Sequence, residues 1–300
     1  QYNPRTFLAG NVRGTATLPL LKKIRKGDTI VMELDSWQLQ GFGEAKISPN
    51  LSIFTTFLPD HLNYYASTSL STSMERYFTD KANIYKYQKP GDVLIMGKQI
   101  NGEGISEKDW PKSWKLKMIG THNRYNVALA LAAARALKVP DYVSRKVTQS
   151  FAGLPGRLEF VRTVKGVKYY NDTTSTTPDS LLAALKAIDN KVILIMGGAS
   201  KNLPLEGLAL ELPKYCKHLI LLPGSGTDNL KSYRPKARLT VGQAKSLKEV
   251  ENLPQAIKEA TRVAKRGDVV LLSPAFASFG LFKNEFDRGD QFVGAVKKLK

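Results

Sequence analysis

Short apolar runs alternate with helical segments along nearly the whole chain. The runs are bounded by turn residues, which is typical of buried parallel strands. The predicted strands span residues 28–34, 51–56, 93–96, 191–198, 218–226 and 269–275. The predicted helices span residues 73–88, 122–137, 141–153, 178–188 and 253–268, with a further helical region over 283–300. This alternation predicts an α/β fold built from βα units.

The pattern is interrupted once, at the Gly- and Pro-containing stretch GLPGR (residues 153–157). It restarts with two runs, 157–164 and 167–172, that flank a turn at Lys165-Gly166 and predict a strand pair. A length of 300 residues suits roughly two domains. We therefore predict two doubly wound α/β domains, over residues 1–154 and 155–300.

The charge balance is strongly basic, with 45 Lys and Arg against 26 Asp and Glu and a formal net charge of +19. Such an excess favours anionic partners, among them nucleotides and nucleic acids. The basic residues are scattered and do not alternate with aromatic residues. A nucleic-acid-binding protein therefore remains an alternative that rests on charge alone.

The cysteine content and the apolar runs indicate the compartment. Cys216 is the single cysteine and excludes an intrachain disulfide. No apolar run approaches the roughly 20 residues that a membrane span needs, and no signal peptide opens the sequence. We therefore predict a cytoplasmic protein without a membrane partner, in which Cys216 and His218 have structural roles.

Three residues near predicted strand ends, or on the helix that follows, have the chemistry of a divalent-metal site. Glu33 closes one apolar run, His61 follows another, and Lys81 lies on the next predicted helix. Glutamate and neutral histidine can bind a divalent ion. An ammonium group repels a cation, so Lys81 can be a ligand only as an anionic carbamate. From the residues alone, ordinary solvated side chains remain the alternative.

Nine motifs, in order from Gly10 to the C-terminus, resemble the Mur ligase family. They are GNVRG, MELDSWQLQ, FLPDHLNYY, YFTDKANIY, HNRYNVALALAAA, GLPGRLEFV, YYNDTTSTTPDS, GGASK and LLSPAFASFGLFKNEFDRGDQF. The last four are most similar to the members that add D-glutamate. The resemblance implies the later part of a central ATPase domain, followed by a Rossmann-like C-terminal domain that binds the amino acid.

The resemblance also implies a reaction in peptidoglycan synthesis, and with it roles in cell-wall biogenesis, cell shape and division. ATP would convert the carboxylate of UDP-N-acetylmuramoyl-L-alanine into an acyl phosphate, which the amine of D-glutamate would then attack. Both steps gather negative charge, so Mg²⁺ and fixed cations are implied as well. We expect a monomer with these small-molecule substrates.

Several residues acquire roles from the resemblance. Glu33 and His61 match positions around Mg²⁺ and the acyl phosphate, and Lys81 matches a lysine that is carbamylated in the family. Asn11 matches a position that contacts the muramoyl substrate.

The nucleotide is assigned to four residues by the same resemblance. Asn123 and Asn126 match positions on the adenine side, and Arg157 and Asp172 match residues that hold the phosphates and the ribose. Without the resemblance, helix capping remains an alternative for the two asparagines, and a surface charge for Arg157.

The incoming D-glutamate is assigned to Thr176, Lys201, Ser278 and Phe279. Lys201 would supply a positive charge for its carboxylate, and Ser278 a hydroxyl and a backbone donor. Taken alone, Lys201 is compatible with a solvated lysine and Phe279 with a core aromatic residue.

The sequence also departs from the family. The UDP-binding domain is missing, and no G-x-x-x-x-G-K-[ST] or G-x-G-x-x-G loop is present, so we expect that the chain as given does not turn over alone. Asp35 stands where Ser is usual and Thr174 where Lys is frequent. An insertion, ASTSLSTS (residues 66–73), lengthens the span between His61 and Lys81. Two alternatives remain, a Mur or folylpolyglutamate-type ligase with another acceptor, and a non-catalytic binding module.

Overall fold

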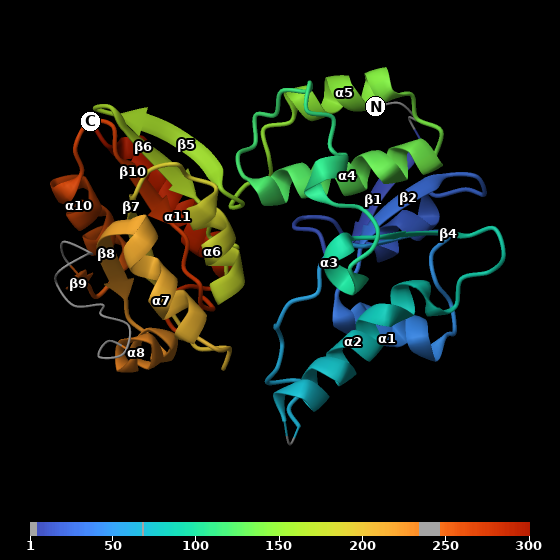
Figure 1. Ribbon diagram of the computed structural model, residues 1–300, viewed down its shortest axis with the longest axis horizontal. Helices are drawn as coiled ribbons and strands as arrows, with labels where there is room; N and C mark the ends of the chain where they lie inside the picture. Colours follow the sequence, from blue (N-terminus) through green and yellow to red (C-terminus); the bar gives the residue numbers. More distant parts are fainter. Residues whose placement is uncertain (1–4, 68, 234–246) are drawn as a thin grey trace. The chain divides into compact units, whose positions relative to one another are not determined.

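The computed structural model describes residues 5–67, 69–233 and 247–300, and the chain divides into two compact units (Figure 1). Unit 1 consists of Gln1–Phe57, Tyr64–Trp114 and Tyr125–Thr148. Unit 2 consists of Leu58–Asn63, Lys115–Arg124 and Gln149–Lys300. Among the described residues, no helix is both long and apolar enough to cross a membrane.

Unit 2 is built on a six-stranded sheet with the order β5-β6-β10-β7-β8-β9. Its strands are β5 (Glu159–Val164), β6 (Val167–Asn171), β7 (Val192–Gly197), β8 (Cys216–Leu222), β9 (Leu247–Glu249) and β10 (Val269–Leu272). Only the β5–β6 pair is antiparallel. The chain runs outward from β7 to β9 and then returns to place β10 between β6 and β7. Ligands of open α/β sheets bind where strand order reverses in this way, outside the carboxyl ends of the strands.

Helices cover both faces of this sheet, as the prediction of an α/β fold requires (Figure 1). One face packs against α6 (Pro178–Lys186), α7 (Glu206–Tyr215) and α8 (Ser225–Ser232), and the other against α10 (Leu253–Val263) and α11 (Glu285–Lys298). Successive side chains of a strand point to opposite faces. In β7, Leu194 and Met196 accordingly join the first core cluster, whereas Ile193 and Ile195 join the second.

Local signals in the sequence fix where these helices begin. Thr177 forms a capping box with Ser180, and Pro178 follows in the first turn of α6, where proline is favoured. Asn252 and Asn284 cap α10 and α11 by accepting from Gln255 N and Asp287 N. The caps set the direction in which each helix leaves the sheet.

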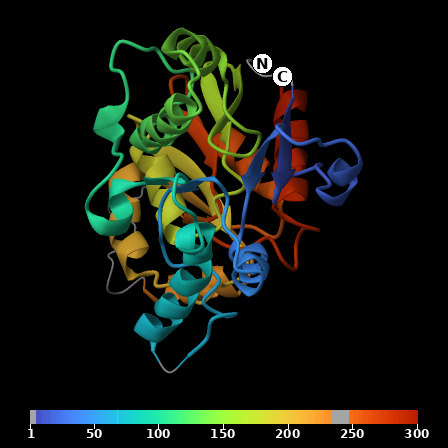
Figure 2. The ribbon, with the colours of Figure 1, turned by 90° about the vertical axis from the view of Figure 1, so that its right-hand side faces the viewer.

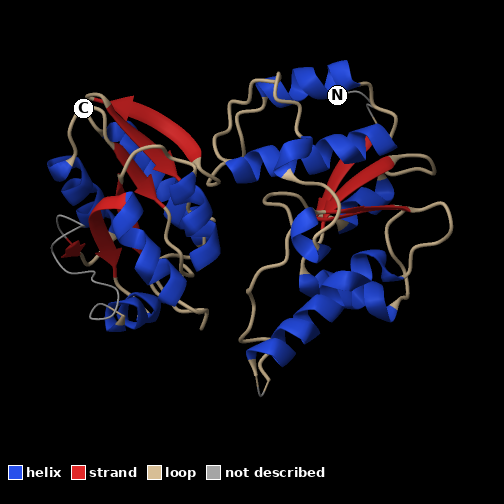
Figure 3. Ribbon diagram, viewed as in Figure 1, coloured by secondary structure: helices blue, strands red, loops and turns tan. Residues whose placement is uncertain are grey.

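The strands of unit 1 form two separate parallel pairs. β1 (Thr6–Gly10) pairs with β2 (Thr29–Glu33), and β3 (Leu51–Phe54) pairs with β4 (Val93–Met96). Around them are the helices α1 (Ser36–Glu44), α2 (Leu70–Lys86), α3 (Lys98–Asn101), α4 (Thr121–Ala136) and α5 (Asp141–Ser150), and the 3-10 turns η1 (Leu18–Lys22) and η2 (Glu107–Asp109) (Figure 3). The first residues of α4 are grouped with unit 2.

The helices α1 and α2 lie against each other (Figure 2). The buried amide of Asn83 donates to Leu39 O at 3.1 Å. Gly43 permits this approach, because a Cβ there would lie 2.4 Å from Asn83 Nδ2. This hydrogen bond therefore fixes α1, the helix that follows β2, against α2.

Several elements differ from those predicted from the sequence. The strand β1 and the helices α1 and α7 were not predicted, because glycines in α1 and a proline inside α7 obscure their helical signals. The helix predicted over 73–88 begins at Leu70, since Ser69 caps it. The helix predicted to reach Gly153 ends at Ser150. The predicted insertion over 66–73 contains position 68, which lies outside the described residues.

Candidate functional site

Two glycines end β7 and shape the loop that follows it. Gly197 and Gly198 have φ angles of 126° and 140°. A Cβ would lie 2.3 Å from Leu222 O at the first and 2.2 Å from Ala277 O at the second. Ala199 and Ala277 then exchange two backbone hydrogen bonds, of 2.9 and 3.0 Å. The loops after β7 and β10 are thereby joined at the carboxyl edge of the sheet.

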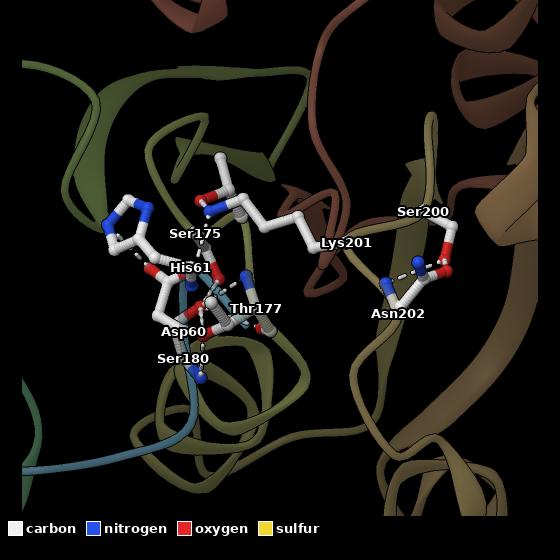
Figure 4. A network of polar contacts seen from close by, with 9 residues as sticks. Asp60, His61, Ser175, Thr177, Ser180, Ser200, Lys201 and Asn202 are labelled. Carbon is white, nitrogen blue, oxygen red and sulfur yellow. Dashed lines mark hydrogen bonds and ion pairs between the residues drawn. The ribbon is translucent and has the colours of Figure 1, made fainter. Parts of the chain in front are cut away.

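This loop presents Lys201 to two oxygen atoms (Figure 4). Its Nζ lies 3.0 Å from Thr176 Oγ1, on the loop after β6, and 3.0 Å from Asp60 Oδ1. The side chains of Lys201 and Asp60 are 23% and 25% exposed, so their ion pair is partly screened from water. The structure therefore brings together two of the predicted acceptor residues, Thr176 and Lys201.

Asp60 also holds its neighbour His61 (Figure 4). Asp60 Oδ1 accepts from His61 N at 2.8 Å, and Asp60 Oδ2 lies 3.6 Å from His61 Nε2. His61 has a φ of 55°, a left-handed conformation that is uncommon for a residue other than glycine. It lies in the loop beyond the end of β3 at Phe54. Asp60 was not among the predicted site residues, although it adjoins His61 in the sequence.

Residues on either side of Lys201 fix the loop further. Asn202 Nδ2 donates to Asn63 Oδ1 at 2.8 Å, and Asn202 N donates to Ser200 Oγ at 3.0 Å. Ser200 N donates to Ser225 Oγ at 3.0 Å, at the start of α8. The segment 58–63 is therefore tied to the loop after β7 at two points, Asp60 and Asn63.

The two other predicted acceptor residues, Ser278 and Phe279, follow β10. Ser278 is buried, at 4% exposure, and its carbonyl accepts from Phe282 N at 3.2 Å. The side chain of Phe279 is 71% exposed, so the alternative of a core aromatic residue is wrong. Ser278 shares an edge of the sheet with Thr176 and Lys201, because all three follow parallel strands.

A pocket of about 270 Å³ lies in unit 2 beside the β5–β6 hairpin. Its lining combines cationic, aromatic and apolar side chains, and consists of Lys117, Met118, Ile119, Asn123, Ala152, Arg157, Leu158, Phe160, Lys168 and Tyr170. Two of these, Asn123 and Arg157, were predicted to bind the nucleotide, whereas Lys117 and Lys168 were not predicted. A cationic pocket with aromatic walls suits an anionic ligand that carries a planar ring.

The predicted asparagines lie inside α4 and do not cap it. The helix begins at Thr121, and Asn123 Nδ2 donates to Ile119 O at 2.7 Å. Asn126 follows one turn later on the same face. The capping alternative is therefore wrong for both residues.

Asp172 is buried at the end of β6, with both carboxylate oxygens bonded to the protein. Oδ1 accepts from Leu158 N at 2.9 Å, and Oδ2 accepts from Ser273 Oγ at 2.7 Å. Burial raises the pKa of Asp172 to about 6, while these hydrogen bonds act in the opposite direction. In this arrangement the carboxylate joins the ends of β6 and β10 to the start of β5.

The predicted metal-site residues of unit 1 are Glu33 and Lys81. Glu33 ends β2, and its carbonyl accepts from Asn11 N at 2.7 Å, so the structure brings Asn11 and Glu33 to one strand edge. Lys81 lies on α2 with its Nζ 5.9 Å from the centroid of the Tyr77 ring. Among the described residues, no three His, Cys, Asp or Glu side chains form a metal-binding group. Mg²⁺ needs fewer, since one or two carboxylates and substrate phosphates usually hold it, and the exposed Glu33 fits that requirement.

Comparison with known proteins places the chain in a family. Residues 156–276 match the model of the Mur ligase, glutamate ligase domain. The chain is 34% identical to UDP-N-acetylmuramoylalanine–D-glutamate ligase of Roseiflexus sp. (strain RS-1), and the match covers 99% of this chain and 71% of that protein. It is 33% identical to the protein of the same name from Clostridium botulinum (strain Alaska E43 / Type E3), with 98% and 69% covered.

Solved structures support the same fold at lower identity. MurF from Acinetobacter baumannii superimposes with a TM-score of 0.67 at 14% identity, over 97% of this chain and 76% of that one. The UDP-N-acetylmuramate-alanine ligase MurC from Thermotoga maritima gives 0.59 at 16% identity, over 90% and 64%. From the sequence relatives, of which it spans about 70%, we conclude that this chain belongs to the Mur ligase family of peptidoglycan synthesis.

Proposed function

We propose that this protein is an ATP-dependent ligase that joins D-glutamate to UDP-N-acetylmuramoyl-L-alanine in the cytoplasm, through an acyl phosphate. The observation that carries the proposal is the position of Lys201, whose Nζ lies 3.0 Å from Thr176 Oγ1 at the carboxyl edge of the unit 2 sheet. An ammonium and an adjacent hydroxyl are donors that suit a carboxylate. The D-glutamate ligases among the relatives support D-glutamate as the source of this carboxylate.

Asp60 gives the acceptor site its charge balance. In the structure its carboxylate neutralises Lys201 at 3.0 Å. A carboxylate of the incoming amino acid would share Lys201 and Thr176 with Asp60, and Asp60 in turn suits the ammonium group of the same amino acid. The site therefore favours a zwitterionic acceptor over a simple anion.

The nucleotide is assigned to the pocket beside the β5–β6 hairpin. Asn123 and Arg157 line it, and Lys117 and Lys168 add positive charge. Cations that surround a phosphate chain stabilise the charge that develops as the phosphoryl group is transferred. Asp172 would support this site by holding Leu158, and Asn126 is assigned to the nucleotide through the family resemblance alone.

Glu33, His61 and a carbamylated Lys81 are proposed for the metal and the donor substrate, with Asn11 beside Glu33 for the muramoyl group. Glu33 would hold Mg²⁺ together with substrate phosphates. When bound, Mg²⁺ would neutralise phosphate charge and orient the reacting carboxylate. With ¹³C-labelled bicarbonate, a carbamate ¹³C signal is expected for the wild type and not for Lys81→Ala. A signal that is unchanged in the variant would contradict this assignment of Lys81.

The test of the reaction is release of phosphate with ATP, Mg²⁺ and UDP-N-acetylmuramoyl-L-alanine. The acceptors to compare are D-glutamate, L-glutamate and diaminopimelate, with the chain as given and with the longest protein that its gene encodes. Release that requires D-glutamate supports the proposal. Release with another acceptor retains the ligase chemistry and refutes the acceptor, and no release with any of them refutes the proposal.

The acceptor site is tested separately by Lys201→Met. A hydrogen bond to a charged group contributes about 1.5–3 kcal/mol, so the KM for D-glutamate should rise about tenfold to a hundredfold. The KM for ATP should change little. Lys191→Met is the matched control, because Lys191 directly precedes the same strand β7 and donates to Pro213 O. An equal KM for D-glutamate in the two variants would contradict the role of Lys201.

A further inference from the structure

The helix α11 carries a fully buried arginine at the centre of unit 2. Arg288 has a relative exposure of 0%. Its Nε donates to Thr173 Oγ1 at 3.1 Å, its Nη2 to Thr173 O at 2.8 Å and its Nη1 to Phe276 O at 3.3 Å. All three hydrogen bonds end on neutral oxygens. Arg288 Cζ also lies 5.9 Å from the centroid of the Phe282 ring.

The acceptors of these hydrogen bonds belong to two different loops. Thr173 lies on the loop after β6, three residues before Thr176. Phe276 lies on the loop after β10, two residues before Ser278. One planar guanidinium therefore spans the two loops that carry a predicted acceptor-binding hydroxyl each. The guanidinium holds these donors on three nitrogens in one rigid plane, whereas a lysine would have to donate from a single nitrogen at the end of a flexible chain.

Contacts around Thr173 and Gly289 support the hydrogen bonds of Arg288. Thr173 Oγ1 accepts from Arg288 and donates to Glu285 O at 2.7 Å, so its hydroxyl has one orientation. Gly289 lets α11 approach the loop, because a Cβ there would lie 2.5 Å from Thr173 Cγ2. The loops are also joined directly by Ala275 N, which donates to Ser175 O at 2.9 Å.

Burying a cation among neutral acceptors is costly, and it is a poor way to gain stability alone. Burial lowers the pKa of Arg288 to about 10, so the side chain is still charged at neutral pH. Well-packed apolar side chains of similar volume often stabilise such a position as well or better. The presence of a buried cation at this position therefore points to a requirement for a defined geometry of the two loops.

We propose that Arg288 is a positioning residue for the acceptor amino acid, fixing the loop that carries Thr176 against the loop that carries Ser278. The proposal rests on the proposed function in one respect, the assignment of Thr176 and Ser278 to the acceptor. Its geometric part, that Arg288 fixes the two loops against each other, does not depend on any substrate. The two parts are therefore tested by separate measurements.

The geometric part is tested by hydrogen exchange on the chain as given, with the variants Arg288→Gln and Arg288→Lys. Amides of residues 173–177 and 275–279 should exchange about tenfold faster or more in both variants, because each loses the fork. Amides of β7 should keep their protection. Arg162→Gln is the matched control, since Arg162 donates to a carbonyl in the last turn of this helix, Lys297 O at 2.8 Å, but is not fully buried.

Either of two results overturns the geometric part. Unchanged exchange in both loops would show that Arg288 does not fix them. Restored protection in Arg288→Lys would show that charge, and not the fork, is what matters. Because hydrogen exchange needs no catalysis, this measurement decides the question even if Arg288→Gln is inactive. If Arg288→Gln fails to fold, Arg288→Lys alone provides the comparison.

The functional part is tested by the KM values in the phosphate-release assay. Arg288→Lys should raise the KM for D-glutamate about tenfold and leave the KM for ATP within about twofold. The displaced residues include Thr176 and Ser278, whereas Asp172 keeps its own hydrogen bonds to Leu158 N and Ser273 Oγ. Equal increases for both substrates would indicate a structural role and overturn it, as would an unchanged KM for D-glutamate. A wild-type protein without D-glutamate-dependent release refutes the proposed function, and the hydrogen-exchange result then stands by itself.

Discussion

The strands β2 and β7 have similar apolar sequences but very different surroundings. Val192 to Met196 in β7 are all 0% exposed. In β2, Ile30, Val31 and Met32 are 40%, 51% and 36% exposed. Both runs precede segments with predicted site residues, so the difference does not follow from sequence type or from proximity to function.

The difference follows from what packs on each strand. β7 lies between β10 and β8, and helices cover both faces of its sheet. Within the described ranges β2 pairs with β1 alone, and Leu8 of that partner is itself 50% exposed. An apolar run is typical of a parallel strand buried on both faces, but the helices that bury it are encoded elsewhere in the sequence. The comparison shows that such a run specifies the strand, whereas neighbouring elements determine its stability.

The largest expected effect is obtained by making the same substitution in both strands. Ile195→Ala should lower the free energy of unfolding of unit 2 by about 2–5 kcal/mol, because it leaves a cavity in a closed core. Ile30→Ala should lower that of unit 1 by about 1 kcal/mol or less, since much of its side chain already contacts water. The units can be followed separately, because Trp37, Trp110 and Trp114 all lie in unit 1. Their fluorescence reports unit 1, and hydrogen exchange in β7 reports unit 2.

Similar losses in the two variants would contradict this comparison. They would indicate that β2 is covered from water in solution. The double variant provides the control. Its two effects should add to within about 0.5 kcal/mol, because distant and independent sites behave additively.

The fold of unit 2 was predictable where local signals agreed with the tertiary structure. The Lys165-Gly166 turn has φ angles of 49° and 80°, the geometry of a two-residue hairpin turn, and β5 and β6 pair across it as predicted. The helix α7 was not predictable in this way. Gly207 and Pro213 lower its helical propensity, and burial of Leu208 and Leu212 against the sheet overrides that propensity.

The candidate site was predictable only in part. Thr176 and Lys201 follow two parallel strands of one sheet, β6 and β7, which have β10 between them, and their resemblance to family motifs marked both. Asp60 was missed because its partner Lys201 is 141 residues away in the sequence. No local sequence pattern predicts an ion pair over such a separation. Arg288 was missed for a related reason, since a buried arginine and a solvated arginine have the same sequence signal.

The second expected effect is on the pH dependence of stability, to which one carboxyl in each unit contributes with opposite sign. Burial raises the pKa of Asp172 to about 6, above its ordinary value of 3.8. Between these values native unit 2 holds a proton that the unfolded chain has released, so its stability falls as pH rises from about 4 to about 6. The expected loss is at most about 3 kcal/mol. Asp172→Asn should remove this dependence, with protection of β7 amides as the measurement.

Asp92 in unit 1 provides the opposite case. Backbone donation by Lys89 N and side-chain donation by Asn50 lower the pKa of this exposed carboxyl. Its contribution is therefore present above pH 3.8 and is lost as the pH falls through its lowered value. Tryptophan fluorescence should show unit 1 losing stability toward acid, and Asp92→Asn should reduce that loss. A pH dependence unchanged by Asp172→Asn in unit 2, or by Asp92→Asn in unit 1, would contradict the corresponding assignment.

The smallest expected effect tests where unit 1, with its exposed strands, is tightly packed. Gly41 and Gly43 both lie in α1, but a Cβ at Gly41 meets nothing within 4 Å, whereas one at Gly43 lies 2.4 Å from Asn83 Nδ2. Gly41→Ala should stabilise unit 1 by about 0.5–1 kcal/mol, because alanine favours the helix. Gly43→Ala gains the same propensity but must displace a buried amide from Leu39 O, so it should destabilise by about 1 kcal/mol. If fluorescence-detected unfolding shows both variants stabilised, the contact between α1 and α2 is loose. The exposed strands of unit 1 would then be matched by an equally open helix pair.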